Sequence, residues 1–188
     1  LKNKISKKTK AILAVHILGN SPDMNQFKKI IKKNKIKLIE DTCESLGTKF
    51  NNKYLGSFGE FGTFSFYYSH QITSGEGGMI TCNDSNNYRI IHSMRSHGWD
   101  RGLKNNKKNF NFINSGFNLR PTEVSAAIGY NQFKKLNFFK KIRSFNRKKI
   151  IEIVNTIAPE HLELCLRNND QIIKGIKNAG SIFVGKYS

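Results

Sequence analysis

Three side chains that could carry chemistry, Asp41, Ser65 and His70, stand at or just after the ends of short apolar segments. They supply a carboxylate, a hydroxyl and an imidazole, and an imidazole can move protons near neutral pH. The apolar segments read as strands of a largely parallel sheet, and ligands bind beyond the carboxyl ends of such strands. The positions of these three residues therefore make them candidates for one site.

A second pair with acid–base character, Glu160 and His161, lies near the end of the chain. An adjacent Glu–His pair is by itself most often a solvated helix end, although its groups can exchange protons. The glycine-rich stretch from Gly75 to Gly78 has no Lys-Ser/Thr after it and no G-x-G-x-x-G spacing. It is therefore only a weak indication of a phosphate-binding loop.

Strands and helices alternate along the chain, which predicts an α/β fold with a largely parallel sheet covered on both faces. Strands are expected at residues 12–16, 37–41, 61–67, 79–82 and 181–185. A first helix is expected to begin at Ser21-Pro22, with Ser21 as the N-cap and Pro22 in the first turn. Further helices are expected from Asp84 to about Arg95, from Pro121-Thr122-Glu123 onward and over residues 136–157. A last helix is expected from a cap at Asn169-Asp170 to Gly180.

Composition places the chain among globular proteins, with 38% hydrophobic and 24% charged residues in 188. No apolar run approaches the roughly 20 residues that cross a bilayer, so we expect no membrane span. The formal net charge of +19 invites a nucleic-acid partner, but the lysines are scattered and no binding motif accompanies them, so none is expected. The cysteines Cys43, Cys82 and Cys165 are far apart, which disfavours a disulfide framework and favours a cytoplasmic location.

Five ordered motifs in residues 1–147 resemble the DegT/DnrJ/EryC1/StrS family of nucleotide-sugar aminotransferases and dehydratases. The motifs are Ala14-Val-His-Ile-Leu-Gly-Asn20, Ile39-Glu-Asp-Thr-Cys-Glu-Ser-Leu-Gly47, Gly62-Thr-Phe-Ser-Phe-Tyr67, His70-Gln-Ile-Thr-Ser-Gly-Glu-Gly-Gly78, and Gly116-Phe-Asn-Leu-Arg120 leading to Ala126-Ala-Ile-Gly129. The resemblance implies part of the large domain of a fold-type-I enzyme that depends on pyridoxal phosphate (PLP) or pyridoxamine phosphate (PMP).

Four residues take coenzyme-binding roles by this resemblance. Asp41 corresponds to the carboxylate that keeps the pyridine nitrogen of the coenzyme protonated, which makes the ring an electron sink. Glu44 matches a position that packs near the ring, and Ser65 matches the hydroxyl that holds the phosphate. Asn118 matches the residue that reaches the phosphate of a neighbouring subunit, so the resemblance implies a homodimer.

His70 stands where aminotransferases of this family have the lysine that binds the coenzyme covalently. An imidazole cannot form that stable bond, but it can act as a base. The substitution is similar to the 3-dehydratase branch, which uses PMP to remove the 3-hydroxyl of a nucleotide-linked 4-keto-6-deoxy sugar. The resemblance therefore implies His70 as the catalytic base. A transaminase that has lost its lysine is the alternative.

Residues 148–188 resemble histidinol dehydrogenase, which uses zinc and NAD to oxidise histidinol to histidine. The likeness is carried by Glu152 to Leu164, with Ala-Pro-Glu-His-Leu, by Ile176 to Gly185 and by Tyr187-Ser188. It implies that Glu160 and His161 are a catalytic acid–base pair, while a zinc site would lack ligands here. The sequence thus predicts a chimera of two enzyme fragments, 1–147 and 148–188, that is inactive as it stands. The first hypothesis is a sugar dehydratase or aminotransferase fragment, and the alternatives are a histidinol dehydrogenase fragment and a basic binding module.

Overall fold

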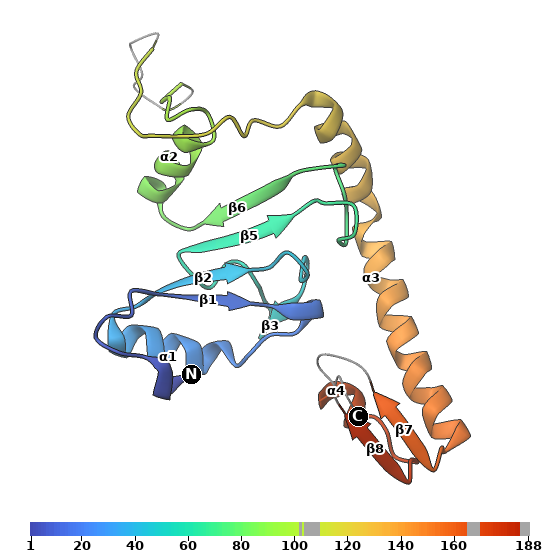
Figure 1. Ribbon diagram of the computed structural model, residues 1–188. Coiled ribbons are helices and arrows are strands. Elements are labelled where there is room, and N and C mark those ends of the chain that lie inside the picture. The colour runs from blue at the N-terminus through green and yellow to red at the C-terminus, as the bar shows by residue number, and fades with distance from the viewer. Residues whose placement is uncertain (102, 104–109, 165–169, 185–188) are drawn as a thin grey trace. The chain divides into compact units, whose positions relative to one another are not determined.

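The computed structural model describes the chain except for residues 102, 104–109, 165–169 and 185–188 (Figure 1). It divides into two compact units, residues 1–133 and 134–188. The helix α3 (Glu123–Ile157) continues from the first unit into the second. The predicted division into 1–147 and 148–188 stays a prediction.

The first unit is built on a sheet with the strand order β1 (Ala11–Val15), β2 (Lys37–Asp41), β5 (Phe61–Ser65) and β6 (Gly78–Cys82). The first three strands are parallel, and β6 runs antiparallel to β5. The α/β class and the strand positions are confirmed, although the strand expected at 61–67 ends at Ser65. The chain after Ser65 instead forms the loop that returns to β6 (Figure 1).

Helix α1 (Met24–Asn34) joins β1 to β2 and covers one face of this sheet. Its N-cap is Asp23 and not Ser21, because the Asp23 carboxylate accepts hydrogen bonds from the N–H groups of Asn25 and Gln26. Fully buried Met24 packs with Ala14, Leu38 and Leu55, and Phe27 and Ile31 lie against this core.

The opposite face of the sheet is open. Side chains alternate between faces along a strand, and the β1–β2–β5–β6 register places Val15, Asp41, Thr63 and Ile80 in one row on the open side. Val15 and Ile80 are about half exposed, whereas Leu38, on the α1 side, is buried. Within the described first unit, apolar side chains on this open face therefore remain accessible.

Shorter elements complete the first unit. They are the 3-10 turns Lys2–Lys4 and Ile17–Gly19, the hairpin of β3 (Lys49–Phe50) and β4 (Lys53–Tyr54), and α2 (Ser85–Met94). Asp84 caps α2 by accepting from the N–H of Asn87, and Arg95 is the C-cap, as the sequence predicts.

The second unit contains the parallel strands β7 (His161–Leu164) and β8 (Ser181–Val184) and the short helix α4 (Asp170–Ile173). The predicted helix to Gly180 ends early, at Ile173. Its predicted cap at Asn169 and the predicted strand end at Gly185 lie outside the described residues. The two helices expected after Pro121 form one continuous helix, α3.

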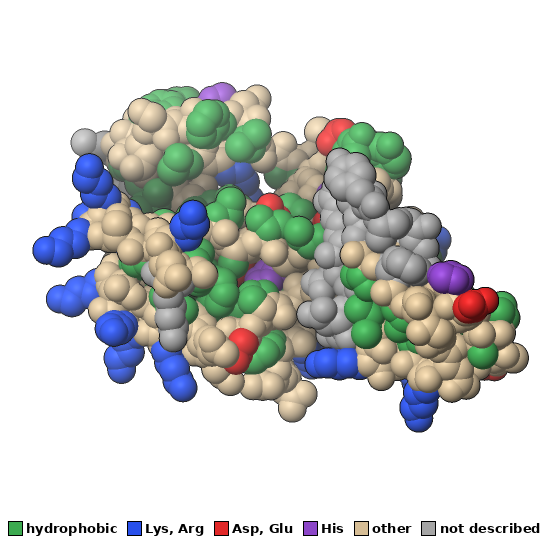
Figure 2. Space-filling model, turned by 60° about the horizontal axis from the view of Figure 1, so that its bottom comes forward, with side chains coloured by type: hydrophobic (Ala, Val, Ile, Leu, Met, Phe, Trp, Pro, Cys, Tyr) green, Lys and Arg blue, Asp and Glu red, His purple; other side chains and the backbone are tan. Residues whose placement is uncertain are grey.

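No helix in the described parts of the chain is long and apolar enough to cross a membrane. On the face that Figure 2 presents, Lys and Arg side chains project outward and hydrophobic side chains are exposed between them.

Candidate functional site

Asp41 and Ser65 end neighbouring parallel strands at the same edge of the sheet. Asp41 pairs with Thr63, and Ser65 is the next residue of β5 that points to the same side as Thr63. Both side chains therefore belong to the open face. A carboxylate and a hydroxyl are thus presented together at the carboxyl edge, where ligands bind in sheets of this kind.

The carboxylate of Asp41 is tied to the turn that follows it. Its Oδ1 accepts a hydrogen bond from the N–H of Cys43 at 3.1 Å, and its carbonyl accepts from the N–H of His16 at 2.9 Å. Burial raises the pKa of the Cys43 thiol to about 11, and the neighbouring Asp41 carboxylate contributes to the increase. The thiol therefore stays neutral at pH 7.

Glu44 links the three loops at this edge. Its Oε2 accepts a hydrogen bond from the N–H of Leu18, in the loop after β1, at 2.9 Å. Its carbonyl accepts from Nε2 of Gln71, in the loop after β5. Ser45 adds a further connection, because its hydroxyl accepts from the N–H of Gly19 at 3.1 Å and donates to the carbonyl of His16.

His70 lies in the loop between β5 and β6. Its N–H donates to the carbonyl of Tyr67 at 3.2 Å, and the two rings lie edge to face with centroids 6.4 Å apart. The described part of the chain gives its ring nitrogens no hydrogen-bond partner. The half-buried imidazole therefore has both ring nitrogens free of hydrogen bonds to the described residues.

Asn118 has an exposed side chain in the segment before α3. Its backbone forms an isolated bridge with Ser96, and the next residue, Leu119, donates its N–H to the carbonyl of Arg95. No hydrogen bond among the described residues joins Asn118 to Asp41, Ser65 or His70. The structure thus does not bring the four coenzyme candidates and His70 into one connected cluster.

The predicted pair in the second unit is exposed. His161 begins β7, and its Nε2 lies 3.9 Å from Oε1 of Glu160, with 67% and 90% of the two side chains accessible. Glu160 immediately precedes β7, and the role of the pair as a catalytic acid–base pair stays a prediction. Among the residues that the structure describes, no three His, Cys, Asp or Glu side chains gather in a way that could hold a metal ion.

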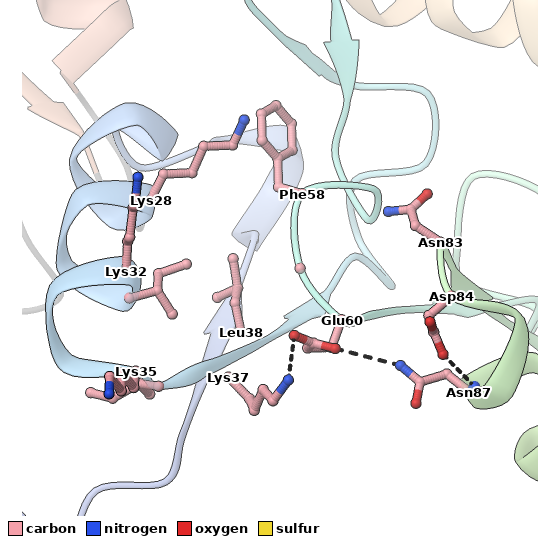
Figure 3. A pocket seen from close by; sticks show the side chains of 13 residues that line it. Lys28, Lys32, Lys35, Lys37, Leu38, Phe58, Glu60, Asn83, Asp84 and Asn87 are labelled. Atoms are coloured by element: carbon pink, nitrogen blue, oxygen red, sulfur yellow. Dashed lines mark hydrogen bonds and ion pairs between the residues drawn. The ribbon is translucent and has the colours of Figure 1, made fainter.

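A groove of about 780 Å³ lies at the other end of the sheet, between α1, the start of β2 and the turn before α2 (Figure 3). Lys37 at the start of β2 pairs with Glu60 at 2.8 Å, and Lys28 lies 5.1 Å from the centre of the Phe58 ring. None of the predicted site residues lines this groove. Its lysines are exposed and come from α1, the residue after it and the start of β2.

Four residues that sequence reasoning did not single out support the site: His16, Glu40, Ser45 and Gln71. His16 and Glu40 are fully buried and lie 3.1 Å apart, Nε2 to Oε2. Each of the four lies within one of the motifs quoted from the sequence, next to or near a residue with an assigned role. A charged residue in the apolar strand before Asp41 was the available signal for Glu40.

The chain is similar to known proteins over most of its length. The sequence model of the DegT/DnrJ/EryC1/StrS aminotransferase family matches residues 1–169. GDP-4-keto-6-deoxy-D-mannose 3-dehydratase from Escherichia coli O55:H7 is 43% identical over 164 residues, covering 81% of this chain and 42% of that protein. GDP-perosamine synthase from Escherichia coli O157:H7 is 36% identical over 158 residues, covering 82% of this chain and 42% of that protein.

A solved structure is similar as well. It is the structure of E. coli GDP-4-keto-6-deoxy-D-mannose 3-dehydratase with bound hydrated PLP. The two structures align with a TM-score of 0.76 and 41% sequence identity, over 81% of this chain and 42% of that chain. The chain therefore spans about two fifths of the length of these relatives. None of these similarities is to histidinol dehydrogenase, and the family match runs past residue 148, so the predicted second fragment and chimera gain no support. The chain belongs to the DegT/DnrJ/EryC1/StrS aminotransferase family.

Proposed function

We propose that this chain is the part of a nucleotide-sugar 3-dehydratase that holds the coenzyme ring and supplies the catalytic base. The proposed coenzyme is PMP, and the proposed substrate is a GDP-linked 4-keto-6-deoxy sugar. The observation that carries the proposal is His70, an imidazole where a transaminase needs a lysine. The 43% identity to a 3-dehydratase supports this choice of reaction.

The side chains at the carboxyl edge fit such a coenzyme. Asp41 and Ser65 share the open face, so the coenzyme could contact Asp41 through its pyridine nitrogen and Ser65 through its phosphate. Asp41 would hold a proton on the pyridine nitrogen, and Ser65 would donate a hydrogen bond to the phosphate. When bound, the coenzyme would supply an electron sink for loss of the sugar hydroxyl.

His70 would move the proton. Its ring has no hydrogen-bond partner within the described residues, and an imidazole nitrogen can accept a proton and donate it again. It can therefore act first as a base and then return the proton as an acid. It cannot hold the coenzyme covalently, so the coenzyme would be bound only by noncovalent contacts.

Glu44 and Asn118 would act around this centre. Glu44 holds together the loops after β1, β2 and β5 through Leu18 and Gln71, which favours a role in shaping the pocket. Asn118 would reach a phosphate bound by a second subunit, and its exposed side chain agrees with that role. A homodimer is accordingly part of the proposal.

A full-length hybrid tests this function. Residues 1–169 would replace the matching segment of the E. coli 3-dehydratase, and the hybrid would be assayed with PMP and GDP-4-keto-6-deoxy-D-mannose. We expect loss of the 3-hydroxyl, and a drop of at least roughly 100-fold in His70→Asn, as removal of a general base gives. A hybrid that folds and binds PMP but only aminates the sugar would contradict the proposal in favour of an aminotransferase.

Glu160 and His161 have no part in this proposal. They lie in the second unit with exposed side chains. Neither zinc nor NAD is proposed.

A further inference from the structure

The two buried ionisable side chains behind the candidate site form one unit. His16 directly follows β1, Glu40 is the next-to-last residue of β2, and both side chains are inaccessible to solvent. Nε2 of His16 lies 3.1 Å from Oε2 of Glu40. A buried carboxylate is expensive unless donors surround it, so this arrangement calls for a reason.

The Glu40 carboxylate is held by more than the imidazole. It accepts hydrogen bonds from the backbone N–H groups of Gly56 at 2.8 Å, Phe58 at 2.6 Å and Gly59 at 2.8 Å. Burial raises the pKa of Glu40, but the bonds from His16 and the three N–H groups outweigh it and hold the pKa below its ordinary value. The carboxylate is therefore ionised and fixed in direction.

The backbone of His16 contacts both ends of the turn from Asp41 to Ser45. Its N–H donates to the carbonyl of Asp41 at 2.9 Å, and its carbonyl accepts from the hydroxyl of Ser45. The N–H of Thr42 donates to the carbonyl of Thr63 at 2.9 Å. His16, the residue after β1, thus contacts Asp41, which carries the proposed coenzyme carboxylate, and its close neighbours Glu40 and Ser45.

We propose that His16 and Glu40 are positioning residues for Asp41. Consecutive side chains of a strand point to opposite faces, so a Glu40 anchored on the buried side directs Asp41 to the open side. The hydrogen bond from His16 to the Asp41 carbonyl fixes the end of the strand at the same time. This inference deepens the proposed function and rests on it for the meaning of Asp41, but its geometry can be measured without coenzyme.

Cys43 offers a native probe of that geometry. Its N–H donates to Oδ1 of Asp41 at 3.1 Å, and burial, followed by the Asp41 carboxylate, raises the pKa of its thiol to about 11. If Asp41 turns away, the carboxylate no longer opposes the thiolate, and the thiol pKa falls. The pH dependence of Cys43 alkylation therefore reports where Asp41 points.

The experiment uses the full chain with Cys82 and Cys165 replaced by serine. The rate of iodoacetamide labelling is followed from pH 7 to 12 in five variants: His16→Leu, His16→Gln, Ser45→Ala, Asp41→Asn and Met24→Ala. We expect His16→Leu and Asp41→Asn to lower the Cys43 pKa by roughly one pH unit each. His16→Gln keeps a donor and should stay near the parent value.

Two of the variants separate positioning from simple loss of stability. Met24 is fully buried in the apolar core with Ala14, Leu38 and Leu55, so Met24→Ala should destabilise the chain and leave the Cys43 pKa unchanged. Ser45→Ala removes the donor to the His16 carbonyl and the acceptor of the Gly19 N–H but leaves the contact between His16 and Glu40 in place, so it should give a smaller decrease. It provides a second test if His16→Leu does not fold. Asp41→Asn is the positive control, and a Cys43 pKa that falls in Asp41→Asn but stays at the parent value in the folded His16→Leu and Ser45→Ala variants would overturn the proposal.

PMP affinity is measured on the same proteins as a separate readout. We expect binding to weaken roughly tenfold in His16→Leu and less than threefold in His16→Gln, as for loss and retention of one charge-assisted contact. If no variant and no parent chain binds PMP while the thiol results are as expected, the proposed function fails and the positioning of Asp41 stands. If PMP binds equally to all, the pair does not serve the coenzyme site.

Discussion

The carboxylate of Glu44 accepts a hydrogen bond from the backbone N–H of Leu18 at 2.9 Å, and this contact joins the loops after β1 and β2. Leu18 has a left-handed backbone, with a φ of 51°, which is unfavourable for a leucine. The hydrogen bond therefore holds a loop conformation that the local sequence does not favour. Since Gln71 also binds the Glu44 carbonyl, Glu44 is the point at which the site loops meet.

Replacement of Glu44 tests this connection. Glu44→Ala should lower the free energy of unfolding by about 1 kcal/mol, because the N–H of Leu18 loses its partner at a partly exposed position. Glu44→Gln keeps an acceptor oxygen and should cost less than half as much. Urea denaturation of both variants measures the difference. Equal losses would show that the negative charge, and not the hydrogen bond, is what matters.

Because Glu40 is buried and ionised, we expect the free energy of unfolding to decrease at acidic pH. Its folded-state pKa lies below its ordinary value of 4.5, so its contribution is fully present above about pH 4.5 and is lost as the pH falls through the folded pKa. Urea denaturation from pH 7 to pH 3 should show this decline. Glu40→Gln cannot bind that proton and should be less stable at pH 7 but have a flatter profile. Parallel profiles would contradict the assignment.

Gly56 and Gly75 provide a matched pair, with φ angles of 82° and 85°. A Cβ on Gly56 would lie 2.5 Å from the Phe64 ring, whereas a Cβ on Gly75 would meet nothing within 4 Å. Gly75→Ala should therefore cost about 1 kcal/mol of backbone strain alone. Gly56→Ala should cost roughly 3 kcal/mol or more, because the strain is joined by overpacking against the Phe64 ring and the Thr42 hydroxyl. Thermal or urea unfolding of the two variants checks the ranking, and equal costs would argue against close packing at Gly56.

Ser65 should matter for the coenzyme and little for the fold. Its hydroxyl accepts only the N–H of Tyr67, at 3.2 Å, among the hydrogen bonds described. Ser65→Ala should weaken PMP binding about tenfold, as expected for one lost hydrogen bond to a phosphate. Ser6→Ala, before β1 and exposed, is the control and should bind PMP as the parent does. Calorimetric titration gives both affinities, and an unchanged affinity in Ser65→Ala would remove Ser65 from the proposed phosphate site.

His70→Lys should change how the coenzyme is held. In the full-length hybrid, the parent should show no protein–PLP adduct that borohydride can trap, because an imidazole forms no stable bond to the coenzyme aldehyde. The lysine variant should be trapped and should favour amination of the sugar over dehydration. Mass spectrometry after reduction detects the adduct. A borohydride-stable adduct in the parent would contradict the role given to His70.

Local sequence was sufficient for the strand that ends at Asp41 and for α2 with its Asp84 cap, because apolar runs and caps are short-range signals. It extended the strand that ends at Ser65 by two residues. It placed the cap of α1 at Ser21, since Ser21 and Asp23 are both good caps and only hydrogen-bond geometry separates them. The continuous helix α3 was divided in two because its exposed surface carries no clear apolar stripe.

Residue types and their order determined by themselves the family, the α/β class and the candidates Asp41, Ser65 and His70, because these depend on identities along the chain. Only the tertiary structure decided that Asp41 and Ser65 share the open face, which depends on the register between β2 and β5. It also revealed that Glu40 accepts from His16 and from three N–H groups of a distant loop. A buried carboxylate must accept hydrogen bonds, and its donors come from segments that are distant in sequence, so its partners cannot be predicted from neighbouring residues.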